Sequence, residues 1–265
     1  MTATRSLSPE DHLSLQSAKQ RMNNISWAMR GLNKMGNVIE QRLQVLPQKQ
    51  QKWLQEISYK VLHTVVKSNL ITMQPANVKP PLNKAYKMLV TTSGAVGGAL
   101  GATAFVMDLT LATKLMMRSI MDIARDEGED LDTLDTQLAC LQVFALGGKS
   151  RHDNSLETGY YASRIAIHST VKGGATLTGK ALQGALRGST NPMLQVLAAV
   201  ASRFSVQVSE KFVAQAIPLV GAVGGASVNL AFIGHFQQMA QAHFAIRRLE
   251  RKYGEGVIKE TYNRI

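Results

Sequence analysis

The sequence has one cysteine and few aromatic residues, and each shortage narrows what the protein can do. The lone Cys140 among 265 residues excludes an intramolecular disulfide and a zinc site built on several cysteines. Aromatic residues make up only 6% of the chain, too few to interleave with a basic face, so we expect no specific nucleic-acid partner. Residues 1–11 carry no secretory signal, so we expect a cytoplasmic location.

Acidic residues are also scarce. The chain has 18 Asp and Glu against 30 Lys and Arg, a net charge of +12. Before Met88 the chain has thirteen basic and four acidic residues, so +9 of the net charge lies in the first third of the sequence. Such a balance attracts anionic surfaces, among which we expect membrane lipid.

Residues 9–72 form a first unit with helical periodicity. From Met22, apolar residues recur at steps of three, four and seven up to Leu46. The opposite face carries the candidates for lipid contact, Arg21, Arg30, Lys34 and Arg42. A second amphipathic helix follows, with apolar positions at Trp53, Leu54, Ile57, Val61 and Val65. Three prolines in residues 73–84 then predict a hinge.

Residues 85–259 form a second unit in which no long stretch alternates with period two. An acidic turn at 125–132 precedes a helix at 134–146, and Pro192 begins another helix after a Gly, Ser and Thr rich loop at 172–190. The acidic turn either stays solvated or pairs with the basic residues 247–252. The pattern predicts an all-α helical bundle.

The letters GAVGGA occur twice, beginning at Gly94 and Gly221, an offset of 127. Residues 120–131 also resemble residues 246–257, at an offset of 126. The sequence thus contains two similar copies, at about 93–131 and 220–257, which predict two related helical units facing each other across a pseudo-two-fold axis. Chance identity is the alternative. Small residues four apart make a stripe that lets helices approach closely. We expect helix packing at Gly94, Gly98, Ala102, Gly221 and Gly225.

The glycine-rich stretches are open to three interpretations. Residues 88–107 carry no formal charge over twenty positions, about the length of a membrane span. Their threonines and glycines make them only weakly apolar, so we do not expect a stable span. Close packing in a soluble bundle and shallow insertion into a membrane both remain open.

No catalytic, metal or cofactor site emerges. Residues 174–181 have the spacing of a phosphate-binding loop, but Ala181 replaces the required hydroxyl residue and no strand precedes them. His235 and His243 are rotated by about 80° on a helix, which disfavours a shared metal. Ser209 has no evident His and Asp partners.

Six blocks in order carry a family resemblance: RSIMDIARDEGEDL from Arg118, ACLQVFALGG from Ala139, GYYASR from Gly159, RFSVQVSEK from Arg203, AQAIPLVGAVGGASVN from Ala214 and HFQQMAQAHFAIRRLERKYG from His235. They resemble the bacterial EcsC protein family over residues 87–257, and we expect the segment before Pro80 to lie outside the likeness. The resemblance implies a hydrophobic helical protein related to one encoded beside an ABC transporter, and it implies no particular reaction or cofactor. The candidate polar site within these blocks comprises Arg203, Glu210, Asn229, His243, Arg247 and Glu250.

Together these features predict a non-enzymatic protein associated with the inner face of the cytoplasmic membrane. A soluble helical adaptor for a membrane-transport protein is one alternative. An uncharacterised hydrolase with a site near His243, Arg247 and Glu210 is the other.

Overall fold

Helices make up nearly all of the chain that can be described. The computed structural model describes residues 7–22, 36–72, 87, 101–146, 161, 164, 192–216 and 218–265. The elements in order are α1 (Pro9–Met22), α3 (Gly36–Gln44), α4 (Gln48–Thr72), α6 (Gly101–Asp126), α7 (Leu134–Gln142), the 3₁₀ helix η2 (Val143–Ala145), α10 (Pro192–Gln215), α11 (Pro218–Tyr253) and α12 (Glu255–Arg264). These residues include no strand, which confirms the all-α prediction.

Helix α4 confirms the expected amphipathic pattern. Leu54, Ile57, Val61 and Val65 are buried at steps of three and four, and α4 packs against α10 and α6. Trp53 lies beside this stripe, with its ring centroid 6.1 Å from that of Phe105 on α6. The start of α4 therefore lies against the start of α6.

Helices α6 and α11 lie side by side and run parallel. Hydrogen bonds from α6 and the turn after it to α11 join residues 118 to 124 positions apart, beginning with Asp108 and Asn229 and continuing to Glu127 and Arg251. The two helices of the expected repeat are thus neighbours in one register. The repeat itself and its pseudo-two-fold axis stay predictions.

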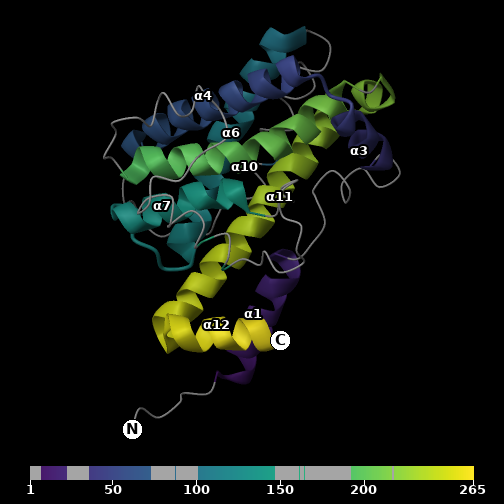
Figure 1. Cartoon of the computed structure of the whole chain (residues 1–265). Coiled ribbons are helices and arrows are strands. Elements are labelled where there is room, and N and C mark those ends of the chain that lie inside the picture. The colour runs from purple at the N-terminus through teal and green to yellow at the C-terminus, as the bar shows by residue number, and fades with distance from the viewer. Residues whose placement is uncertain are drawn as a thin grey trace.

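Helix α11 is about 54 Å long at the usual helical rise and crosses the molecule from α3 to α12 (Figure 1). Helices α1 and α12 pack against its C-terminal part. Few apolar residues fix α1, whose buried hydrophobic residues are Leu15 and Ala18. Polar contacts add to them, including a hydrogen bond of 2.7 Å from Lys19 Nζ to the Tyr262 carbonyl.

A turn follows α6, where the sequence predicts an acidic turn. Gly128 has a φ of +81°, a left-handed conformation that other residues rarely adopt. Thr133 then caps α7, its side chain accepting a hydrogen bond from the Thr136 backbone amide at 3.3 Å. Helix α10 begins at Pro192, also as predicted.

One hydrophobic cluster joins all parts of the described chain. Leu15 of α1, Leu54 of α4, Ile120 of α6 and Phe236 of α11 belong to it. Residues from both expected units therefore share a core, and the boundary between the units, at 73–84, lies outside the described residues.

Several other expectations fall outside the described residues. They are the glycine-rich residues 88–100, the phosphate-loop spacing at 174–181 and the loop at 172–190. Within the described helices, none combines the length and apolar character needed to cross a membrane.

Candidate functional site

A buried ion pair joins α6 to α10 in the middle of the bundle. Lys211 Nζ lies 2.7 Å from Asp108 Oδ2, and both side chains are almost completely buried, 0% and 3% exposed. Asn229 of α11 donates a hydrogen bond of 2.7 Å to Asp108 Oδ1, and Gln215 donates one of 3.3 Å to Oδ2. We call these four residues the Asp108 cluster. It connects three helices through one carboxylate.

The two charges of this pair respond differently to burial. Burial acts to raise the pKa of Asp108, but Lys211 and the two amide donors outweigh it and lower that pKa. Burial lowers the pKa of Lys211, and Asp108 opposes that shift. The ammonium also lies 5.2 Å from the centre of the Phe232 ring, a cation–π distance.

A second ionic cluster joins the acidic turn to the C-terminal part of α11. Arg247 contacts Glu129 through two hydrogen bonds of 2.8 and 3.0 Å and Asp135 through one of 2.7 Å. Arg251 also bonds Glu129, and Arg248 bonds Glu127 at 2.8 Å. Of the two alternatives for the acidic turn, the structure shows the pairing with residues 247–252, through Glu127 and Glu129.

Glu129 is the centre of this second cluster. Burial acts to raise its pKa, but hydrogen bonds and charge from Arg247, followed by Arg251, lower it. The Thr136 hydroxyl also donates a hydrogen bond of 3.0 Å to Glu129 Oε2. The carboxylate is thus held by three side chains from two helices, Thr136 of α7 and Arg247 and Arg251 of α11.

His243 and Glu250 lie on the same part of α11. Glu250 accepts hydrogen bonds from Arg164 at 2.7 Å and from the Tyr161 hydroxyl at 2.9 Å. His243 is completely buried. Burial, together with the charges of Arg164 and Arg247, lowers its pKa well below the usual range, so the imidazole is neutral.

The six predicted polar-site residues do not form one site. Asn229 belongs to the Asp108 cluster, whereas His243, Arg247 and Glu250 lie about 21 Å or more further along α11. Arg203 and Glu210 are half-buried on α10. No group of three or more His, Cys, Asp or Glu in the described part of the chain is arranged to hold a metal ion.

Exposed apolar and basic side chains meet where α3 turns into α4. Val38 is 36% exposed and Val45 77% exposed, and Arg42, Lys49 and Lys52, close to them in sequence, are exposed as well, as is Glu40. We call the two valines and the three basic residues the basic corner. The start of α6 lies close by through the contact of Trp53 with Phe105, and it carries the exposed Met107 and Leu111.

The predicted lipid contacts are divided between two places. Arg42 belongs to the basic corner, but Arg21 lies in the last turn of α1, the helix that packs against the C-terminal part of α11 (Figure 1), and it donates a hydrogen bond of 3.0 Å to Gln241. The two arginines therefore do not share one helix face, because the chain changes direction between α1 and α3. Arg30 and Lys34 lie outside the described residues.

The predicted packing glycines are only partly described. Gly221 and Gly225 lie in the first turns of α11, and Gly94 and Gly98 lie outside the described residues. Ala102 is exposed, which differs from the expected packing position, because it lies in the first turn of α6 before the buried stripe begins at Phe105.

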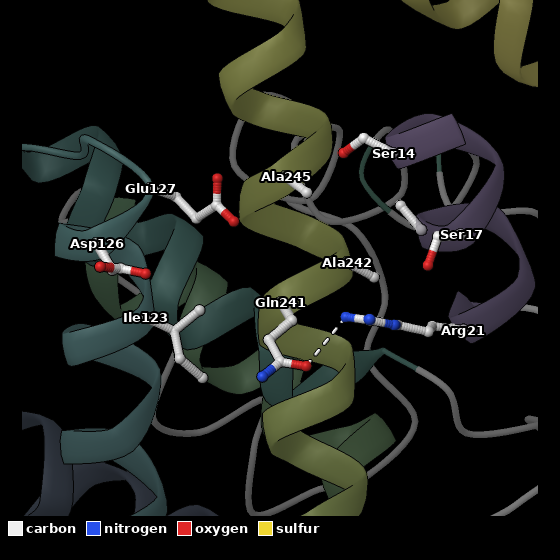
Figure 2. A pocket seen from close by; sticks show the side chains of 10 residues that line it. Ser14, Ser17, Arg21, Ile123, Asp126, Glu127, Gln241, Ala242 and Ala245 are labelled. Carbon is white, nitrogen blue, oxygen red and sulfur yellow. Dashed lines mark hydrogen bonds between the residues drawn. The ribbon is translucent and has the colours of Figure 1, made fainter. Parts of the chain in front are cut away.

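A polar pocket of about 430 Å³ lies between α1, α6 and α11 (Figure 2). Helix α1 contributes Ser14, Ser17, Ala18 and Arg21. The end of α6 and the turn after it contribute Ile123, Asp126 and Glu127, while α11 contributes Gln241, Ala242 and Ala245. The pocket thus has an arginine on one wall and carboxylates on the other.

Sequence reasoning missed two of these features. Asp108 directly follows the uncharged residues 88–107, and a lone acid in an apolar helix is a signal for a buried partner that the sequence analysis did not use. The pocket carries no sequence signal, because its walls come from helices more than 100 residues apart.

These features define an all-helical protein whose helices are joined by buried ionic contacts. A family model described as the EcsC protein family matches residues 11–249, so the chain belongs to this family. The match begins at residue 11, which corrects the expectation that the likeness excludes the segment before Pro80. The N-terminal helices share the common core, which explains why they belong to the family's region. Neither the curated proteins nor the solved structures gave a match.

Proposed function

We propose that this protein is a non-enzymatic, membrane-associated protein that binds peripherally at the inner face of the cytoplasmic membrane. The observation that carries the proposal is the basic corner, where Val38 and Val45 are exposed among Arg42, Lys49 and Lys52. Anionic lipid attracts the basic groups, and exposed apolar side chains bury themselves at the headgroup boundary.

The surroundings of the corner support the same function. Trp53 packs against Phe105 and Phe212, with ring centroids 6.1 and 5.7 Å apart, which anchors the corner to a rigid bundle. Met107 is 71% exposed at the start of α6, the helix into which the glycine-rich stretch leads. Conditional insertion of that stretch would therefore begin beside the surface that first meets the lipid.

The hydrolase alternative has less support. Its residues Arg247 and Glu210 lie on different helices, and Arg247 is engaged by Glu129 and Asp135. Helix-to-helix ion pairs of this kind favour a structural role.

Flotation of the full chain with liposomes tests the proposal. Vesicles of neutral phosphatidylcholine and vesicles containing anionic phosphatidylglycerol are compared at low and high salt. We expect binding to the anionic vesicles. The double variant Arg42→Glu, Lys49→Glu should weaken it roughly tenfold or more, because each basic group near an anionic surface contributes about 1 kcal/mol.

The matched control is Lys259→Glu, Arg264→Glu on α12, which changes the net charge equally at the other end of the molecule. Binding that both double variants weaken alike would reduce the effect to net charge and refute the role of the corner. Binding that survives high salt would indicate apolar insertion, and Val45→Ser should then weaken it. No binding to either vesicle would favour the soluble adaptor.

A further inference from the structure

We infer that the polar pocket between α1, α6 and α11 binds a small zwitterion that carries an ammonium group at one end and a phosphate or carboxylate at the other. The pocket volume of about 430 Å³ falls within the range of small-molecule sites. This site lies away from the basic corner, so the inference is independent of the proposed membrane function.

The α1 wall of the pocket suits an anionic group. Arg21 Nη1 donates a hydrogen bond of 3.0 Å to Gln241 Oε1, which aims the guanidinium across the pocket toward α11 (Figure 2). A guanidinium has five N–H donors, so this contact leaves others for a ligand. The Ser17 hydroxyl lies one turn before Arg21, and the Ser14 hydroxyl lies one turn earlier still. An arginine with two hydroxyls is a typical donor set for phosphate or carboxylate.

The α6 wall suits an ammonium group. Glu127 is oriented by Arg248, whose Nε donates a hydrogen bond of 2.8 Å to Glu127 Oε2. Asp126 is exposed and forms no ion pair with the described residues. A carboxylate offers about four acceptor positions, so both groups can accept hydrogen bonds from a bound ammonium.

Small side chains leave room between the two walls. Ala242 and Ala245 of α11 and Ala18 of α1 line the pocket where larger residues would fill it. The opposite charges stand on opposite sides of α11 (Figure 2). Arg248 already forms an ion pair with Glu127, so Asp126 is the carboxylate that would repel a simple anion. Arg21 would repel a simple cation, so a ligand with both charges fits best.

Isothermal titration calorimetry on the full chain at low salt tests the inference. The probes are O-phosphoethanolamine and 4-aminobutanoate, compared with inorganic phosphate and ethylammonium as single-charge halves. We expect one zwitterion to bind with one site per chain, and each half to bind at least roughly tenfold more weakly, because it loses the contacts of one wall.

Two conservative variants assign the walls. Arg21→Gln and Asp126→Asn should each weaken zwitterion binding roughly tenfold or more, because each removes one charged partner. Lys60→Gln on α4 and Glu255→Gln on α12 are exposed controls that remove the same charges elsewhere and should leave binding unchanged. Circular dichroism checks that all four variants keep their helices.

The outcomes separate clearly. A loss of affinity in Arg21→Gln and Asp126→Asn alone supports the pocket. The inference is overturned if neither zwitterion binds and phosphatidylethanolamine vesicles show no Arg21-dependent binding. Equal binding of phosphate alone, or unchanged affinity in both pocket variants, would also overturn it. Arg21-dependent binding of phosphatidylethanolamine vesicles, without binding of the soluble probes, would support the same chemistry with a lipid headgroup as its source. Flotation on anionic vesicles is governed by a different surface, so failure of either idea leaves the other standing.

Discussion

Replacing Lys211 by methionine tests whether the Asp108 cluster holds α6, α10 and α11 together. Methionine has a similar length and is apolar, so the variant removes the charge while roughly filling the space. The buried carboxylate of Asp108 then loses its ion-pair partner and keeps the amide donors Asn229 and Gln215. We expect a large loss of folding stability.

The expected magnitude follows from the geometry. At 2.7 Å the two charges attract with about 6 kcal/mol at an effective dielectric constant of about 20, and desolvation of both ions offsets much of that gain. Removing one partner leaves the desolvation of the other uncompensated, which costs about 3–5 kcal/mol. Since domains unfold with about 5–15 kcal/mol, Lys211→Met should lose a large share of the total.

A double-mutant cycle measures the coupling. Asp108→Leu alone leaves a buried ammonium, whereas Asp108→Leu with Lys211→Met removes both charges and should cost only about 1–3 kcal/mol, the cost of the amide groups left behind. Urea unfolding followed by circular dichroism and tryptophan fluorescence gives the free energies. Trp53 is a suitable reporter because it packs against Phe105, whose ring centre lies 6.0 Å from Lys211 Nζ.

The exposed Lys60→Met is the matched control and should change stability by no more than about 0.5 kcal/mol. A loss of stability in Lys211→Met as small as in this control would refute the role of the ion pair. A loss in the double variant equal to the sum of the two single losses would refute it equally, because the two charges would then not be coupled.

Three further predictions concern the C-terminal part of α11 and the acidic turn. Burial, then Arg164 and Arg247, lowers the pKa of His243 in the folded protein. On acidification the imidazole is therefore protonated in the unfolded chain before it is protonated in the folded one, and the free energy of unfolding falls as pH drops below about 6.5. His243→Gln should reduce this fall, which is at most about 1.4 kcal/mol per pH unit, in urea unfolding between pH 6.5 and 5. Glu129→Gln should cost about 2 kcal/mol at pH 7, measured in the same way, and the difference should shrink below pH 4.5, since the carboxylate with its lowered pKa stabilises the fold only while ionised. Gly128→Ala should lower stability by about 1–2 kcal/mol in thermal melting because of its φ of +81°, and Gly128→Asn should cost less.

Local patterns were enough to predict most of the helices. The steps between Leu54, Ile57, Val61 and Val65 identify the buried face of α4, because a helix returns to the same side every three or four residues. Pro192 marks the start of α10, since its missing amide is harmless in the first turn. Opposite charge at 125–132 and 247–252 indicated one of the long-range contacts as an alternative to a solvated turn.

The same local reasoning could not place the elements in space. It treated Arg21 and Arg42 as one basic face, because helical period says nothing about a change of chain direction between them. It grouped Asn229 with His243, although fourteen residues on a straight helix separate them by about 21 Å. Lys211 and its partners in the Asp108 cluster come from three helices, so the pattern within any one helix could not predict the contact.

The parallel course of α6 and α11 explains how one long helix can serve two surfaces. The Asp108–Asn229 contact joins the pair near the basic corner, and the Glu127–Arg248 contact joins it near the pocket. From Asn229 to Gln241 the helix rises about 18 Å, roughly two Debye lengths at physiological salt. Charges at the two proposed surfaces are therefore screened from each other. If both proposals hold, an influence of a pocket ligand on membrane binding would pass through the packing of α6 against α11 rather than through the electric field.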